Sequence, residues 1–113
     1  MHEMSLMESV VEIACETAAQ HGATRIRAIR LDVGQLSHVD PDALLFCYDA
    51  VRRGSLAETA DLEINRVAGE GWCLDCVKTV PLAERFGACP DCGRHRVQMT
   101  AGDELKIRDL EVI

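Results

Sequence analysis

Two pairs of cysteines are the residues best suited to chemistry in this sequence. Cys73 and Cys76 form one CxxC turn, Cys89 and Cys92 form another, and 12 residues separate the turns. The two sulfurs of such a turn lie close together, so two turns can complete a tetrahedron of thiolates around one ion. Four soft thiolates favour zinc or iron over magnesium or calcium. Since four sulfurs leave no open position for water, the pattern predicts a structural zinc site rather than a catalytic one.

Two other interpretations of these cysteines stay open on the sequence alone. A CxxC turn can be a thioredoxin-like redox pair, and four cysteines can also form two disulfides. Two matched turns in one acidic chain favour metal over either, and a redox protein would contain no stoichiometric zinc. The two other cysteines, Cys15 and Cys47, fall within predicted helices and are expected to be buried thiols that act as small apolar side chains.

The start of the chain offers metal donors of a different kind. Met1-His2-Glu3 stands just before a predicted helix. The α-amine, the His2 imidazole and the intervening backbone nitrogens can enclose a divalent ion in chelate rings, and this nitrogen-rich set suits Ni²⁺ or Cu²⁺. A histidine at position 2 is usually a solvated side chain, so these residues do not decide the matter by themselves.

Length and charge limit the classes of protein to consider. The chain has 113 residues, enough for one domain with a small satellite. Its 12 Lys and Arg against 19 Asp and Glu give a net charge of -7, which disfavours binding to nucleic-acid phosphates or anionic lipids. No apolar run approaches the roughly 20 residues of a membrane span, and the acidic start is unlike a signal peptide. We therefore expect a cytoplasmic protein.

Two helices are expected to position these residues. Ser5 begins a capping-box pattern, and apolar residues then recur at three- and four-residue spacing, which predicts a helix over residues 6–21. Asp40 as the cap and Pro41 at the first helical position predict the start of a second helix, with Gly54 as its stop.

The remaining chain is expected to form strands and one metal-organised segment. Three strands are predicted from β-rich or alternating sequence: residues 25–33, 61–67 and 104–112. The fold class is therefore α+β, with two helices packed on a small, mainly antiparallel three-stranded sheet and an inserted four-cysteine, zinc-ribbon-like lobe. Residues 1–68 and 99–113 would form the α+β domain, which carries the N-terminal donors and would be the nickel-binding domain if those donors hold Ni²⁺, and residues 69–98 would form the zinc-binding domain.

Four features together carry a resemblance to a known family. They are the opening Met1-His2-Glu3, the stretch Leu31-Asp32-Val33-Gly34-Gln35-Leu36-Ser37, the paired CxxC turns and the closing Glu104-Leu105-Lys106-Ile107. Over essentially its whole length the chain resembles the HypA/HybF family of nickel metallochaperones, which serve nickel-iron hydrogenase maturation. The resemblance implies that nickel, the transferred cargo, is held by His2 with the Met1 amine and the backbone nitrogens of His2 and Glu3. It also implies structural zinc held by Cys73, Cys76, Cys89 and Cys92.

The resemblance further implies partners and a mechanism. A HypB-type GTPase and the hydrogenase large subunit would be the partners, and some members also serve urease maturation. No Gly-rich phosphate loop, Ser/His/Asp set or paired carboxylates is visible, so we expect a carrier and not an enzyme. The alternative is a zinc-ribbon adaptor for protein or nucleic acid in which His2 is incidental. Unlike the nickel hypothesis, it predicts that a residue added before Met1 does no harm.

The other histidines are expected to have minor roles. His95, three residues after Cys92, could reach the nickel as an added ligand but is expected to be a solvated loop side chain. His21, at a predicted helix end, is expected to interact with the terminal carbonyls. Nothing in the sequence assigns a role to His38.

Overall fold

The computed structural model describes residues 2–113, and Met1 lies outside the described residues. The chain divides into two compact units. Unit 1 comprises residues 2–32, Val39–Asn65 and Lys106–Ile113, and unit 2 comprises Val33–His38 and Arg66–Leu105. Which metal each unit holds stays a prediction. Within residues 2–113, no helix has both the length and the apolar character needed to cross a bilayer.

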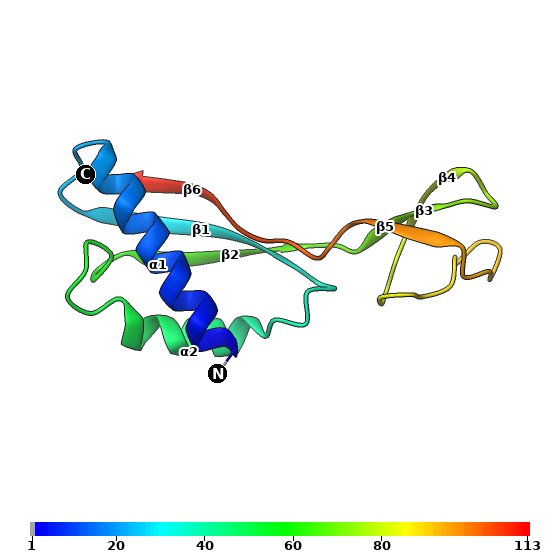
Figure 1. Ribbon diagram of the computed structural model, residues 1–113, viewed down its shortest axis with the longest axis horizontal. Coiled ribbons are helices and arrows are strands. Elements are labelled where there is room, and N and C mark those ends of the chain that lie inside the picture. Colours follow the sequence, from blue (N-terminus) through cyan, green and yellow to red (C-terminus); the bar gives the residue numbers. More distant parts are fainter. Residues whose placement is uncertain (1) are drawn as a thin grey trace. The chain divides into compact units, whose positions relative to one another are not determined.

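Unit 1 contains most of the regular structure of the chain (Figure 1). Its elements are α1 (His2–Gln20), α2 (Pro41–Val51) and a three-stranded sheet of β1 (Ile26–Gly34), β2 (Asp61–Val67) and β6 (Leu105–Val112). The strand order is β2-β1-β6, so β1 lies in the centre. The predicted α+β architecture, with two helices, a three-stranded sheet and an inserted four-cysteine lobe, is confirmed.

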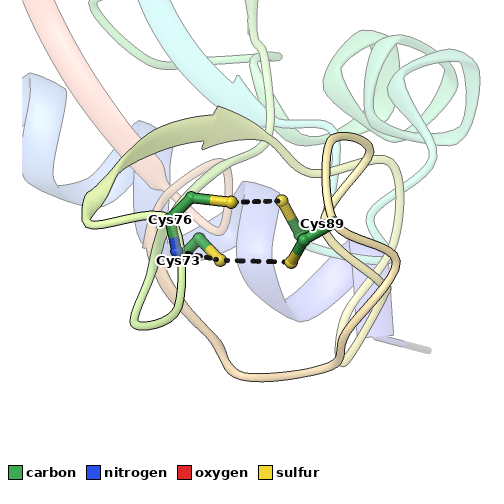
Figure 2. Close-up of side chains that lie close together, drawn as sticks. Cys73, Cys76 and Cys89 are labelled. Atoms are coloured by element: carbon green, nitrogen blue, oxygen red, sulfur yellow. Dashed lines mark hydrogen bonds between the residues drawn. The ribbon is translucent and has the colours of Figure 1, made fainter.

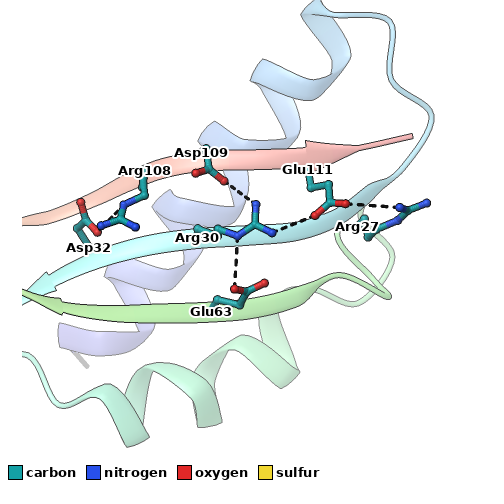
Figure 3. A network of polar contacts seen from close by, with 7 residues as sticks. All are labelled: Arg27, Arg30, Asp32, Glu63, Arg108, Asp109 and Glu111. Carbon is teal, nitrogen blue, oxygen red and sulfur yellow. Dashed lines mark hydrogen bonds and ion pairs between the residues drawn. The ribbon is translucent and has the colours of Figure 1, made fainter.

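The three-stranded sheet is mixed in direction, with one parallel and one antiparallel pair, and is not mainly antiparallel as the sequence predicted (Figure 3). Figure 3 shows β1 and β2 pointing the same way and β6 pointing the opposite way. Arg30 on β1 contacts Glu63 on β2, and two residues later on both strands Asp32 contacts Asn65. The residue numbers rise in the same direction on both strands, so β1 and β2 are parallel. Parallel neighbours cannot be joined by a tight turn, and α2 supplies the crossover connection that they need.

Helix α1 begins four residues earlier than the sequence predicted. It starts at His2, so Ser5 lies inside the helix and the predicted capping box is wrong. The half-buried Met4 and the buried Met7 extend the packed face towards the N-terminus, and this tertiary packing prevails over the local cap signal. Glu3 in the first turn complements the positive end of the helix dipole.

Helix α2 begins where the sequence predicted. The Asp40 side chain accepts a hydrogen bond from the Asp42 N–H at 3.0 Å, and Pro41 occupies the first helical position. The helix ends at Val51, shortly before the predicted stop. The buried Tyr48 hydroxyl donates to the Ala60 carbonyl at 2.7 Å, which fixes the segment that leads into β2.

An ion-pair network links the three strands of the sheet (Figure 3). Arg30 on the central strand donates to Asp109 at 2.8 Å and to Glu111 at 3.0 Å, both on β6. It also lies 3.4 Å from Glu63 on β2. Hydrogen bonding to Asp109 and then Glu111 raises the pKa of Arg30, so its charge is permanent. One guanidinium therefore connects both neighbours of the central strand.

Unit 2 contains a second small sheet that the sequence did not predict. Its strands are β3 (Glu70–Cys73), β4 (Lys78–Pro81) and β5 (Val97–Ala101), in the order β4-β3-β5 with antiparallel pairing. Trp72 on the central strand lies opposite Thr79 and Gln98. Strands of four or five residues are too short to show a clear alternation of apolar and polar residues.

Unit 2 also contains backbones in very close approach. A Cβ at Gly34 would lie 2.0 Å from the Gly102 carbonyl oxygen, and a Cβ at Gly69 would lie 2.2 Å from the Leu82 oxygen. The Leu36 N–H donates to the same Gly102 oxygen at 2.6 Å. Only glycine fits at positions 34 and 69, because the obstructing atoms belong to the backbone.

Replacing Gly34 by alanine is expected to lower the free energy of unfolding by about 3 kcal/mol, because the added Cβ overlaps the Gly102 carbonyl. Urea unfolding followed both by the fluorescence of Trp72, the one tryptophan of the chain, and by far-ultraviolet circular dichroism measures the change. Gly22→Ala is the control: its φ of +72° makes alanine unfavourable by about 1 kcal/mol, but nothing lies within 4 Å of the new Cβ. Equal effects of the two variants would contradict the steric explanation.

Candidate metal centres

The structure brings the two CxxC turns together in unit 2. Cys73 is the last residue of β3, Cys76 lies in the turn that leads to β4, and the second pair lies in the loop before β5. The Sγ atoms of Cys73, Cys76, Cys89 and Cys92 all lie within 4.8 Å of one another. Figure 2 shows the sulfurs of the two turns facing each other.

The distances between sulfurs fit a four-thiolate metal site. Cys73 Sγ lies 3.8 Å from Cys92 Sγ, and Cys76 Sγ lies 3.9 Å from Cys89 Sγ. A tetrahedron with metal–sulfur bonds of about 2.3 Å has edges of about 3.8 Å. A disulfide needs about 2.05 Å, and all four cysteines are free thiols in this structure. The cluster could therefore hold one metal ion, and the two-disulfide interpretation is wrong for this structure.

The two turns have the same backbone hydrogen bond. The Val77 N–H donates to the Cys73 carbonyl at 2.8 Å, and the Gly93 N–H donates to the Cys89 carbonyl at 2.8 Å. Both donor residues have left-handed backbone, with φ of 54° at Val77 and 74° at Gly93. In the first turn, moreover, the Cys76 N–H donates to Cys73 Sγ at 3.3 Å. The backbone geometry of the two turns is therefore sufficient to aim each pair of sulfurs inward, without help from a metal ion.

Hydrogen bonding moves the pKa values of the thiols apart. The backbone N–H of Cys92, and to a lesser degree that of Asp91, lowers the pKa of Cys89 to about 7. Hydrogen bonding to the sulfur of Cys92 and burial raise the pKa of Cys76 to about 12. The raised pKa of Cys76 favours its protonated form, so a divalent cation must displace a proton to bind this sulfur as a thiolate. Acid should therefore weaken metal binding, and binding should release protons.

The sulfurs also belong to a small buried apolar cluster of unit 2. This cluster consists of Cys73, Val80 and Cys89, with Cys76 and Val97 packed against it. The other buried apolar side chains of unit 2 are Val33, Leu36 and Leu82. Because so few buried side chains offset little of the conformational entropy of ordering unit 2, a bound ion would supply folding free energy that apolar burial does not.

The N-terminal donors lie in unit 1. His2 is the first residue of α1 and its side chain is exposed, whereas Glu3 is half-buried. The first four N–H groups of a helix have no intrahelical partner, so the backbone nitrogens of His2 and Glu3 are free of the helical hydrogen bonds. Met1 lies outside the described residues. Within residues 2–113, no cluster of three or more possible ligand side chains appears besides the four cysteines.

The other candidate ligands have ordinary surroundings. His21 Nδ1 lies 2.9 Å from the Thr17 carbonyl near the end of α1, which confirms the predicted contact with terminal carbonyls. His95 Nδ1 lies 3.2 Å from the Phe86 carbonyl on the exposed surface of unit 2. Cys47 is buried, as predicted for a small apolar side chain, and Cys15 is half-buried.

Fold and site together define a small α+β protein with an inserted lobe organised by four thiols. The family model described as "Hydrogenase/urease nickel incorporation, metallochaperone, hypA" matches residues 1–112. The chain therefore belongs to the HypA family of nickel metallochaperones for hydrogenase maturation, and this family is not one of catalytic enzymes.

Relatives match the chain over nearly its full length. It is 80% identical over 113 residues to "Hydrogenase maturation factor HypA" of Rhizobium leguminosarum bv. viciae, with both chains covered completely. It is 55% identical over 112 residues to the protein of that name from Methylocella silvestris, with 99% of each chain covered. The solution structure of the Ni metallochaperone HypA from Helicobacter pylori matches with a TM-score of 0.73 and 27% identity, covering 98% of this chain and 97% of that one.

Replacing Cys76 by serine is expected to remove most of the bound metal and to unfold unit 2, because three sulfurs remain for an ion and the core of the unit is small. Trp72 fluorescence reports on unit 2, and far-ultraviolet circular dichroism reports on α1 and α2 in unit 1, which should persist. The matched control is Cys15→Ser, outside the cluster, which should keep the metal content of the parent. A Cys76→Ser protein with full metal content would contradict the assignment.

Proposed function

We propose that this chain carries Ni²⁺ at its N-terminus for the maturation of nickel-iron hydrogenase, while Zn²⁺ in the four-cysteine cluster stabilises unit 2. The observation that carries the proposal is the match to the HypA family over residues 1–112, in a chain that has both donor sets. The nitrogen donors lie in unit 1 and the sulfur donors in unit 2. Each metal therefore has its own donor chemistry.

Zinc is the ion that best suits the cluster. Thiolates are soft ligands, and a closed set of four in tetrahedral arrangement is typical of structural zinc. Cys73, Cys76, Cys89 and Cys92 would be the ligands. When bound, the ion supplies folding free energy rather than reactivity, because no coordination position is left for a substrate.

Nickel is treated as cargo and needs a site that can release it. The exposed His2 imidazole, the Met1 amine and the backbone nitrogens of His2 and Glu3 form a nitrogen-rich set that suits Ni²⁺. An exposed site at a chain end should bind in the micromolar range, about 8 kcal/mol, far more weakly than the cysteine cluster. Nitrogen donors must lose protons before they bind, so acid should lower nickel affinity.

The partners follow from the same proposal. A carrier with no reaction of its own needs a recipient, and we propose the hydrogenase large subunit, reached with the help of a HypB-type GTPase. The family description names both hydrogenase and urease, so urease maturation proteins are a second possible destination. Delivery to these enzymes would take place in the cytoplasm.

Replacing His2 by alanine is expected to abolish nickel binding and to leave zinc content and thermal stability unchanged, since the side chain is exposed. Isothermal titration with Ni²⁺ and elemental analysis measure both effects on untagged protein. His21→Ala is the matched control, because His21 is also an exposed histidine of the α1 region. The His21→Ala protein should bind nickel as the parent does. Unaltered nickel affinity in His2→Ala would overturn the assignment.

An added residue before Met1 is expected to remove the amine ligand and with it most of the nickel affinity, while the zinc lobe is unaffected. Comparison of native protein with a variant carrying one extra N-terminal glycine, by the same titration, measures the loss. If the extended protein takes up nickel as the native one does, His2 is incidental and the adaptor hypothesis is favoured.

A further inference from the structure

The two CxxC turns share a pattern of charged residues. Each turn has an aspartate one position before its second cysteine, Asp75 and Asp91, and a cation two positions after that cysteine, Lys78 and Arg94. The ion pairs cross from one turn to the other: Asp75 Oδ1 lies 3.6 Å from Arg94 Nη1, and Asp91 contacts Lys78. Each ion pair thereby forms a tie, a connection between one turn and the segment that follows the other turn.

A third cation strengthens one of the two ties. Arg96 Nη1 donates to Asp75 Oδ1 at 3.0 Å, and the Arg96 carbonyl accepts from the Leu74 N–H at 2.9 Å. Side chain and backbone of Arg96 therefore both reach the first turn. The side chains of Arg94 and Arg96 are 70% and 65% exposed, but the Asp75 side chain is only 15% exposed.

The half-buried position of Asp75 makes this tie the more important one. Its second oxygen, Oδ2, is buried and has no hydrogen-bond partner within residues 2–113, and Arg94 and Arg96 both pair with Oδ1. Lys78 and Asp91 are each about half exposed, and water and salt screen such pairs strongly. The two ties are related by sequence position but differ in burial.

We propose that these crossed ion pairs, Asp75 with Arg94 and Arg96 and Asp91 with Lys78, are positioning groups that slow the release of zinc from the four sulfurs. An ion leaves a closed four-thiolate site when one turn moves away from the other, and each pair opposes that separation. With three cations and two carboxylates, the crossed pairs carry a net charge of +1, which offsets part of the formal charge of about -2 that a four-thiolate zinc centre carries. The inference rests on the proposed structural zinc.

Zinc transfer from the full-length, zinc-loaded chain to excess 4-(2-pyridylazo)resorcinol tests the proposal. Asp75→Asn keeps the size of the side chain and removes its charge, and should accelerate zinc release about tenfold. The matched control is Asp103→Asn, an exposed acid of unit 2 that makes no ion pair within the described chain, and it should release zinc at the rate of the parent. Sodium chloride should accelerate release from both the parent and Asp75→Asn, because both retain the half-exposed Lys78–Asp91 pair that salt screens.

A charge exchange tests the second tie, the pair of Lys78 and Asp91. Loss of packing could not explain recovery of the slow rate in the double variant. Lys78→Asp and Asp91→Lys should each accelerate release about threefold, and the double variant, with the charges exchanged, should restore the slow rate. The absorption of Co²⁺ bound in place of zinc should show tetrahedral thiolate ligation in every variant. If Asp75→Asn fails to fold, this exchange still decides the proposal.

The outcomes separate this inference from the zinc assignment on which it rests. A parent protein without stoichiometric zinc would overturn the structural zinc role itself. Stoichiometric zinc that leaves the folded Asp75→Asn variant and both single charge variants at the rate of the parent would overturn the crossed ion pairs alone, and so would a double variant that fails to recover.

Discussion

The gathering of four sulfurs in a unit with a small apolar core is the constraint on which this structure depends. Cys73 and Cys89 are themselves core residues, packed with Val80. The atoms that would bind an ion are therefore the atoms that hold β3, β4 and the second turn together. In such an arrangement the free energy of metal binding contributes to the free energy of folding, so the stability of unit 2 depends on the ion that is bound. Unit 1 has a conventional apolar core and does not share this dependence.

The two donor sets differ in the ways that retention and delivery require. Backbone hydrogen bonds in the two turns aim the sulfurs inward, and two of the four cysteines, Cys73 and Cys89, are buried. The His2 side chain at the start of α1 is exposed, and the helix leaves the N–H groups of His2 and Glu3 without intrahelical partners. A carrier must release its cargo, so its site should bind the ion weakly. A structural site must retain its ion to stabilise the fold, so it should bind tightly. The proposed assignment of zinc to sulfur and nickel to nitrogen follows from this contrast.

Local signals in the sequence were sufficient for some features and not for others. The Asp40-Pro41 start of α2 and the two CxxC turns depend on neighbouring residues, and the sequence predicted both. The start of α1 depends on packing of Met4 and Met7, which no cap pattern reveals. The short strands of unit 2 depend on pairing across the lobe. The crossed ion pairs were missed although a signal existed, an aspartate before each second cysteine and a cation two residues after it.

The order in which two metals leave the protein tests the central claim most directly. Native, untagged chain loaded with nickel is exposed to a graded series of chelator concentrations, and native mass spectrometry follows both metals while Trp72 fluorescence follows unit 2. The account predicts that nickel leaves first, with zinc and the fluorescence unchanged, and that the loss of fluorescence accompanies the loss of zinc. Nickel that displaces zinc from the protein, or zinc that leaves without any change in unit 2, would contradict it.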